Sequence, residues 1–393
     1  MMAPLRFWSE FAKRGLRASP QTMTLPGMAQ LAAGFEMIER AGLSHARPDF
    51  SMAPVTIGNR ECEVIEEIAF ETPFARLLHF KKDIDTPQPR VLITAPLSGH
   101  FATLLRSTVE VMLPDNDVYI TDWKNARDVP ASAGKFGFDE YVGHVISFLD
   151  EIGPGAHLLG VCQPCAHALA AVALMAQDNH PATPRSLTLM AGPVDTRINP
   201  SKVNELAKDH PIEWFRDNLI ATVPFRYPGA GRRVYPGFMQ LTAFMSMNRE
   251  RHINAHIDMF ADLAAGRTEA AAKNKDFYDE YFAVLDLTAE FYLETVERVF
   301  QEHLLPRGEL EVDGRRIDCS AIKRTALLTV EGERDDICSI GQTVAAQSLC
   351  SGIRPHMKRH HLQPGVGHYG VFSGRKWKSQ IYPLVRNTIL ASE

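Results

Sequence analysis

The segment that most constrains the fold of this chain is Leu158–Cys165, an apolar stretch broken by Gly160 and followed at once by small apolar residues. A strand that turns sharply into a helix exposes one reactive side chain at the edge of the sheet. That side chain then lies at the N-terminus of the helix, where the helix dipole is positive. The usual pattern is Gly-x-Ser-x-Gly, whereas here Cys162 stands at the centre and Pro164 replaces the last glycine. Because a helix N-terminus favours the thiolate, we predict that Cys162 is a nucleophile and not a packing residue.

Two further kinds of reactive residue follow downstream. An apolar strand at Thr325–Gly332 precedes Asp335 and Asp336, and His368 lies later in a loop flanked by glycines. An acid at the carboxyl end of a late parallel strand can orient a histidine, and the spacing makes Asp335 the first choice and Asp336 the alternate. The order nucleophile, acid, histidine is that of α/β-hydrolases and differs from the orders in chymotrypsin-like and subtilisin-like enzymes.

These residue types predict acyl-transfer chemistry. We expect His368 to accept the proton of Cys162 and later to donate one to the leaving alcohol. We expect Asp335 to fix the tautomer of the histidine and to stabilise the imidazolium. The sequence therefore predicts a Cys162, Asp335 and His368 triad.

The oxyanion that forms in acyl transfer needs backbone donors. One expected donor is the amide of Gln163, directly after the nucleophile. The other is expected in the loop that follows the early strand Arg90–Pro96, at Leu97 or Ser98. Both loops would then meet at the carboxyl edge of one sheet.

The pair Cys162 and Cys165 also reads as Cys-x-x-Cys at a strand-to-helix junction, so a thioredoxin-like redox pair is a second interpretation. We favour the redox interpretation less, because the small thioredoxin fold does not include the later loops that carry Asp335 and His368. A zinc site is less favoured still, since the remaining cysteines offer no second close pair. These are Cys62, Cys319, Cys338 and Cys350. We therefore expect no metal.

Strands and helices alternate as far as Ala191, which predicts an α/β fold with a mostly parallel central sheet and helices on both faces. The alternation then stops, and a largely helical, aromatic-rich stretch follows. We interpret it as a cap inserted between core strands, with aromatics that form its own core or line a groove for substrate. The predicted division is 1–196 for N-terminal helices and first part of the core, 197–320 for the cap, and 321–393 for the rest of the core.

With these motifs the chain resembles the intracellular poly(3-hydroxybutyrate) depolymerases, a family of cysteine-dependent α/β-hydrolases. The resemblance runs along nearly the whole chain, in the segments 95–106, 119–127, 160–164, 190–197, 285–292 and 330–337. It implies the same triad and a polyester storage granule as substrate. Related polyester synthases share the cysteine and the Asp122-Trp123 pair, but they keep a glycine where this chain has Pro164. That departure favours degradation over synthesis.

The predicted function is cleavage of polyhydroxyalkanoate esters through an acyl-cysteine intermediate. A thioester can pass its acyl group to water or to a thiol, so no cofactor is required and coenzyme A is an alternative acceptor. A synthase-like acyltransferase and a non-catalytic granule protein are the other interpretations. The expected partners are the amorphous poly(3-hydroxybutyrate) granule and its oligomers. A homo-oligomer is compatible with the sequence, which does not determine the oligomeric state.

Composition limits where and on what the chain acts. The 42 basic and 47 acidic residues give a net charge of −5, which argues against general binding of nucleic acid. No apolar run reaches the roughly 18 residues of a membrane-spanning helix. Charged residues near the N-terminus argue against a secretory signal, and we expect the six cysteines to be reduced. The expected location is the cytoplasm, at storage granules.

Overall fold

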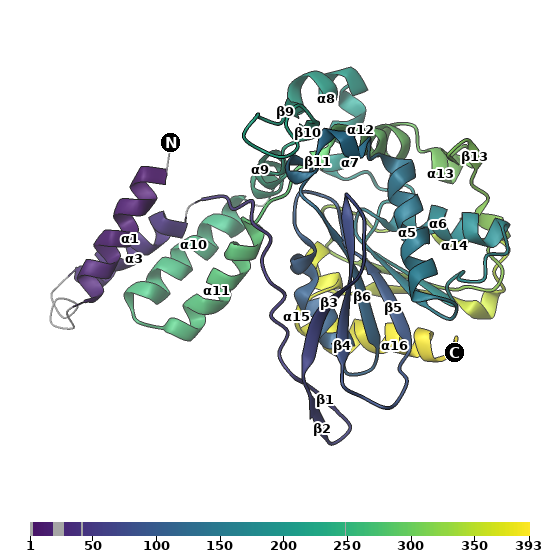
Figure 1. Ribbon diagram of the computed structural model, residues 1–393, viewed down its shortest axis with the longest axis horizontal. Helices are drawn as coiled ribbons and strands as arrows, with labels where there is room; N and C mark the ends of the chain where they lie inside the picture. The colour runs from purple at the N-terminus through teal and green to yellow at the C-terminus, as the bar shows by residue number, and fades with distance from the viewer. Residues whose placement is uncertain (1–2, 19–26, 41, 248) are drawn as a thin grey trace. The chain divides into compact units, whose positions relative to one another are not determined.

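The structure is a computed structural model that describes residues 3–18, 27–40, 42–247 and 249–393 (Figure 1). The chain divides into two compact units. Unit 1 comprises Met1–Pro48 and Gly237–Leu285, and unit 2 comprises Asp49–Pro236 and Asp286–Glu393.

Unit 2 is built on an eight-stranded sheet with the order β15-β14-β8-β7-β5-β6-β4-β3. Its strands are β3 (Val64–Glu71), β4 (Ala75–Lys82), β5 (Arg90–Thr94), β6 (Asp117–Trp123), β7 (His157–Val161), β8 (Ser186–Met190), β14 (Ala326–Gly332) and β15 (Lys358–Gln363). The strands from β5 onwards pair in parallel, and β4 is antiparallel to both β3 and β6. This strand order, with one antiparallel strand second from the edge, is the α/β-hydrolase fold, and the predicted fold class is confirmed.

Helices cover the sheet because its central strands are buried along their whole length, which requires cover on both faces. The helices of this core are α4 (Arg106–Met112), α5 (Phe138–Ile152), α6 (Cys165–Gln177), α14 (Ala346–Leu349), α15 (Gly374–Lys376) and α16 (Tyr382–Leu390). Helices α5 and α6 pack on each other, and α16 packs on β14 and β8. The segment after α4 is tied to α16 by the Tyr382 hydroxyl, which donates to Asp115 at 2.7 Å and accepts from Asn116 at 2.9 Å.

Between β8 and β14, unit 2 carries further elements of the stretch that we interpret as a cap. They are α7 (Lys202–Asp209), α8 (Ile212–Leu219), β9 (Ala221–Thr222), β10 (Arg233–Tyr235), β11 (Leu287–Thr288), α12 (Ala289–Thr295), α13 (Leu304–Arg307), β12 (Glu311–Val312) and β13 (Arg315–Arg316). The strands β9, β10 and β11 form a small antiparallel sheet that the aromatic pattern did not predict. The buried Phe215 packs with Trp214 and Tyr292, so these aromatics belong to a core. The boundaries 197–320 that we assigned to the cap stay a prediction.

Unit 1 is helical. It contains α1 (Ala3–Arg17), α3 (Met28–Arg40), α9 (Gly237–Met247), α10 (Arg249–Ala264) and α11 (Thr268–Tyr281). Helix α3 packs on both α1 and α10, and α10 packs on α11. The buried Glu36 of α3 pairs with Lys275, and Arg40 bonds Asp279 at 2.6 Å. Two segments that lie about 200 residues apart in sequence thus form one helical unit.

Among the described residues, no helix is both long enough and apolar enough to cross a membrane.

Candidate active site

The chain turns sharply at Cys162, between the end of β7 and the start of α6. Cys162 has φ 66°, a left-handed backbone that a residue with a side chain adopts at a cost. Its amide donates to Met190 O on the neighbouring strand at 2.8 Å, which holds the turn. Pro164 fits at the N-cap position of α6 because its φ of −74° is the ordinary proline value, although its side chain makes no capping hydrogen bond. The half-buried Cys162 side chain therefore stands at the N-terminus of α6.

Small residues make room for this turn. A Cβ added at Gly192 would lie 2.1 Å from Cys165 Sγ and 2.6 Å from Cys162 O. A Cβ at Gly160 would lie 3.3 Å from the Ala168 Cβ. Both glycines let the backbone of the turn and the first turn of α6 lie directly against the sheet. No role was predicted for Gly192, although a glycine two residues after the end of β8 could have suggested one.

The structure brings Cys162, His368 and Asp335 together from three separate loops. His368 Nε2 lies 3.0 Å from Cys162 Sγ, and His368 Nδ1 lies 2.8 Å from Asp335 Oδ2. His368 begins a short helical turn after β15, and Asp335 follows β14. Because β14 and β15 are parallel neighbours, the loops that leave them emerge at the same edge of the sheet as the turn at Cys162.

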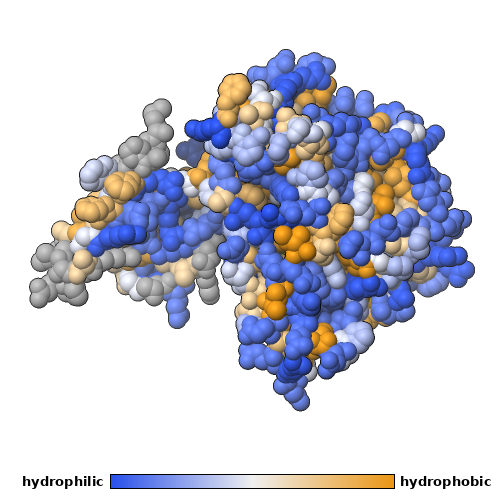
Figure 2. All heavy atoms as spheres, viewed as in Figure 1, coloured by the Kyte–Doolittle hydropathy of each residue, from blue (hydrophilic) through white to orange (hydrophobic). Residues whose placement is uncertain are grey.

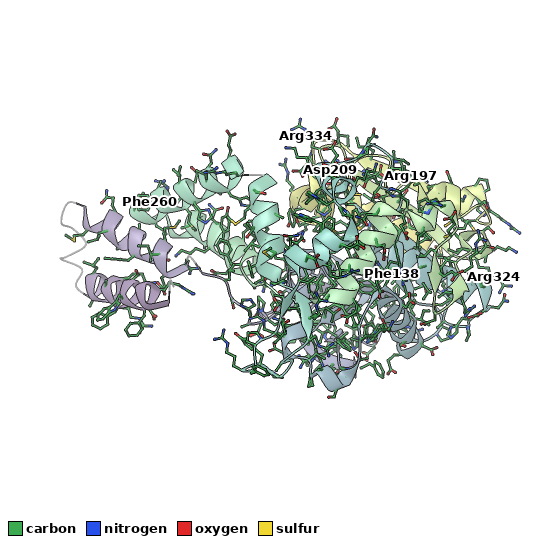
Figure 3. All side chains as sticks on the ribbon, turned by 90° about the horizontal axis from the view of Figure 1, so that it is seen from above. Phe138, Arg197, Asp209, Phe260, Arg324 and Arg334 are labelled. Carbon is green, nitrogen blue, oxygen red and sulfur yellow. The ribbon has the colours of Figure 1, made fainter. Side chains whose placement is uncertain are left out.

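The acid is held by its own loop. Asp335 is buried, and its Oδ1 accepts the amides of Ile337 at 2.9 Å and Cys338 at 2.8 Å. The second carboxylate oxygen is thereby turned towards His368. Asp336 is exposed, as is Arg334 on the other side of the acid (Figure 3). Of the two acids that the sequence left open, only Asp335 bonds the histidine among the described contacts.

Charge at the site favours a protonated histidine. Burial disfavours an imidazolium, but the negative charges of Asp335 and Cys162 and their hydrogen bonds outweigh it. The pKa of His368 is therefore raised well above its ordinary value. A histidine that keeps its proton in this way can donate it to a leaving group.

Of the expected oxyanion donors, Leu97 already has a partner. Its amide donates to the side-chain Oε1 of Gln163 at 3.3 Å, and Gln163 Nε2 lies 3.4 Å from His167 Nδ1. Burial lowers the pKa of His167 to about 3, so its ring is neutral and Nδ1 can accept. For Leu97 to serve as an oxyanion donor, the Gln163 side chain must move aside. The predicted roles of the Ser98 and Gln163 amides stay predictions.

The aromatic side chains beside this loop hold the strand end that precedes it. Trp123 Nε1 donates to Ala95 O at 2.9 Å, and the Tyr141 hydroxyl donates to the same oxygen at 3.2 Å. The Ala95 amide donates to Thr121 Oγ1 at 2.9 Å. Phe138, labelled in Figure 3, stacks on the His167 ring with centroids 3.9 Å apart. This hydrogen bond of Trp123 was not predicted from the sequence, although the Asp122-Trp123 pair is one of its family motifs.

Cys165, the second cysteine of the Cys-x-x-Cys pattern, is fully buried. Its Sγ donates to Gly160 O at 3.3 Å, and burial raises the pKa of its thiol. A buried, protonated thiol is a poor partner for thiol–disulfide exchange. We therefore interpret Cys165 as a packing residue of the turn.

Comparisons with known proteins identify the family. The model of the family described as "PHB de-polymerase C-terminus" matches residues 191–393. The poly(3-hydroxyalkanoate) polymerase subunit PhaC of Haloferax mediterranei is 20% identical over 363 residues, which cover 89% of this chain and 68% of that protein.

Two solved structures are also similar to this chain. A variant of the monoglyceride lipase from Saccharomyces cerevisiae is 12% identical, with 86% of this chain and 98% of that chain covered and a TM-score of 0.48. The monoacylglycerol lipase of Paleococcus ferrophilus is also 12% identical, with coverages of 78% and 97% and a TM-score of 0.45. The fold is assigned from the strand order of the eight-stranded sheet and not from these two structures. With more than half of its length matched, the chain belongs to the PHB de-polymerase C-terminus family.

Proposed function

We propose that this protein is a poly(3-hydroxybutyrate) depolymerase that cleaves polyester ester bonds through an acyl-cysteine intermediate. The observation that carries the proposal is the 3.0 Å approach of His368 Nε2 to Cys162 Sγ, with Asp335 on the other ring nitrogen. The family membership supports the substrate class. The strained turn at Cys162 supports its role as the nucleophile, since such strain is typical of a nucleophile exposed on a sharp turn between a strand and a helix.

The proposed reaction has two halves. The Cys162 thiolate attacks the ester carbonyl carbon, a C–S bond forms, and the C–O bond to the leaving alcohol breaks. The alkoxide takes the proton of His368, so a neutral alcohol departs and a thioester remains. In the second half His368 removes a proton from water, the resulting hydroxide attacks the thioester, and a carboxylic acid leaves. The thiolate and the protonated histidine are then restored.

The acceptor in the second half can also be a thiol. Coenzyme A would give a 3-hydroxyacyl thioester in place of the free acid, by an exchange of one C–S bond for another. No cofactor is needed in either route. The proposed setting is the surface of an amorphous storage granule, where both the polymer and its oligomers are substrates.

The similarity to a polymerase subunit favours one rival, a synthase that uses the same thiol to lengthen chains. Pro164 argues for degradation, because synthases resembling this chain keep a glycine at that place. Purified protein should be incubated with amorphous poly(3-hydroxybutyrate) particles, with and without coenzyme A, and the products identified by mass spectrometry. We expect 3-hydroxybutyrate and its short oligomers, or their coenzyme A thioesters.

A matched incubation with 3-hydroxybutyryl-coenzyme A separates the rivals. Polymer formed from it, with no product released from particles, would identify a synthase. No product in either incubation would favour the non-catalytic granule protein. Cys162→Ala serves as the blank in each case.

Exchange of the acid tests its assigned role and its pH dependence. Asp335 raises the pKa of His368, so Asp335→Asn should lower that pKa and let the histidine lose its proton at lower pH. We expect kcat/KM to fall at least about tenfold and its alkaline limb to move to lower pH. A pH profile with a short 3-hydroxybutyrate ester measures both effects. Asp336→Asn is the matched control and should leave the profile unchanged; the opposite result would move the acid by one position.

Replacement of the thiol by a hydroxyl tests the nature of the nucleophile. In Cys162→Ser the hydroxyl is far less acidic, so His368 must remove its proton during attack instead of stabilising a thiolate already formed. We expect measurable hydrolysis slowed at least about tenfold, a barrier increase of roughly 1.4 kcal/mol. Single-turnover kinetics with the same ester give the acylation rate. A serine variant as fast as wild type would show that thiolate character is unimportant.

A further inference from the structure

The face of the molecule drawn in Figure 2 is largely hydrophilic, as is usual where polar side chains meet water. Two polar side chains of unit 2 depart from this rule, since Thr343 is 0% exposed and Glu331 is 1% exposed. A buried polar group destabilises a protein unless it is hydrogen-bonded. The partners of these two side chains therefore show what they hold in place.

The hydroxyl of Thr343 bonds both backbone groups of Gly192. Its Oγ1 accepts from the Gly192 amide at 2.9 Å and donates to the Gly192 carbonyl oxygen at 2.9 Å. Gly192 is buried as well, so its amide cannot turn to water for a partner. One hydroxyl thus fixes the position of this part of the backbone.

The segment that Thr343 holds supports the turn at Cys162. Met190 O accepts the Cys162 amide at 2.8 Å, and Ala191 has φ 50°, a left-handed backbone that costs free energy. A Cβ at Gly192 would lie 2.6 Å from Cys162 O, so the two backbones are in close contact. A strained segment keeps its shape only where its surroundings fix it, and Thr343 supplies two of the bonds that do so.

Glu331 in turn holds Thr343. Its Oε1 accepts the amides of Thr343 at 2.8 Å and Val344 at 2.9 Å, and its Oε2 accepts the Gly341 amide at 3.0 Å. Glu331 lies in the last turn of the chain before β14 ends, and Asp335 follows the same strand. The strand that leads to the acid therefore also anchors, through Thr343, the segment beside the nucleophile.

We propose that Thr343 is a positioning residue for the nucleophile, and this inference rests on the thiol chemistry of the proposed function. The hydroxyl fixes Gly192, and the Gly192 backbone fixes the Cys162 turn and hence the approach of its Sγ to His368 Nε2. Without the hydroxyl, the buried Gly192 amide loses its partner and the segment must shift to satisfy it. A shift of about 1 Å at a reacting group can cost on the order of 100-fold in rate.

The test compares variants that keep or lose one oxygen atom. Thr343→Val keeps the shape of the side chain and removes the hydroxyl, whereas Thr343→Ser keeps the hydroxyl and removes the methyl group. For a short 3-hydroxybutyrate ester we expect kcat of Thr343→Val to fall at least about tenfold while KM stays within about twofold of wild type. Thr343→Ser should stay within about threefold of the wild-type kcat. If Thr343→Val folds poorly, Thr343→Ala against Thr343→Ser gives the same comparison.

The matched control is Thr325→Val. Thr325 is 1% exposed, and its hydroxyl donates to Pro184 O at 2.7 Å. It lies directly before β14, at the end of that strand opposite to Asp335. Because the control loses the same kind of buried hydrogen bond, its melting temperature should fall as that of Thr343→Val does, whereas its kcat should equal that of wild type.

A second measurement does not depend on the ester. The rate at which iodoacetamide alkylates Cys162, followed by mass spectrometry of the Cys162 peptide, reports on the nucleophile alone. We expect alkylation of Thr343→Val to be at least about threefold slower, because His368 is less well placed to take the proton of the thiol. If the polyester assignment is wrong, no variant cleaves the ester, but this difference in alkylation persists.

Three results would overturn the proposal. One is equal alkylation of Cys162 in wild type and in Thr343→Val. The other two apply to a wild type that hydrolyses the ester: a kcat of Thr343→Val no lower than that of Thr325→Val, and equal losses of kcat in Thr343→Ser and Thr343→Val.

Discussion

Cys162→Ala should reduce ester hydrolysis at least about 100-fold, because the nucleophile is removed and no other thiol among the described cysteines approaches His368. The half-buried side chain has a small packing role, so the melting temperature should change little. Initial rates with a short 3-hydroxybutyrate ester and with polyester particles, beside a thermal melt, measure both quantities.

Cys165→Ala is the matched control for this loss. Its thiol is fully buried and bonds Gly160 O, so its removal leaves a small cavity and costs about 1 kcal/mol of stability while most activity remains. An equal loss in both variants would return the Cys-x-x-Cys redox pair to consideration. Residual activity of Cys162→Ala above a hundredth of wild type would exclude Cys162 as the nucleophile.

Gly192→Ala should also be severely damaging, although glycine to alanine is the smallest of substitutions. The new methyl group would lie 2.1 Å from Cys165 Sγ and 2.6 Å from Cys162 O, and both neighbours belong to a tightly packed turn. The turn must shift, at a cost of about 1–3 kcal/mol for overpacking. Misplacement of the nucleophile by about 1 Å can cost on the order of 100-fold in rate. Steady-state kinetics and denaturant unfolding together measure these effects.

Gly143→Ala provides the comparison for Gly192→Ala. Gly143 lies inside α5, and a Cβ there meets nothing within 4 Å. The exchange should stabilise the protein by about 0.5–1 kcal/mol through helix propensity and leave the rate unchanged. If Gly192→Ala retained full activity, the close packing at the turn would not be what positions Cys162.

The fold was accessible from sequence because its signals are local. Alternating apolar strands and helices predict a parallel sheet wherever each strand is buried on both faces, as β7 and β8 are. The small strands β9, β10 and β11 were missed because two or three residues are too few to show the alternation of apolar and polar residues that marks a strand. The joining of α3 to α10 and α11 was also out of reach, since it depends on long-range packing of α3 on α10 and on the pair of Glu36 with Lys275 of α11.

The sequence by itself determined which residue types stand at the ends of which strands, and in what order Cys162, Asp335 and His368 occur. Its spacing made Asp335 the first choice and Asp336 the alternate, but the direction in which each side chain points cannot be read from sequence. In the structure the amides of Ile337 and Cys338 bond Oδ1 of Asp335, and its Oδ2 lies 2.8 Å from His368 Nδ1. Tertiary structure likewise decided that the Leu97 amide bonds the side chain of Gln163. The reason is that a local pattern records what each residue can do, whereas a contact depends on where distant segments finally lie.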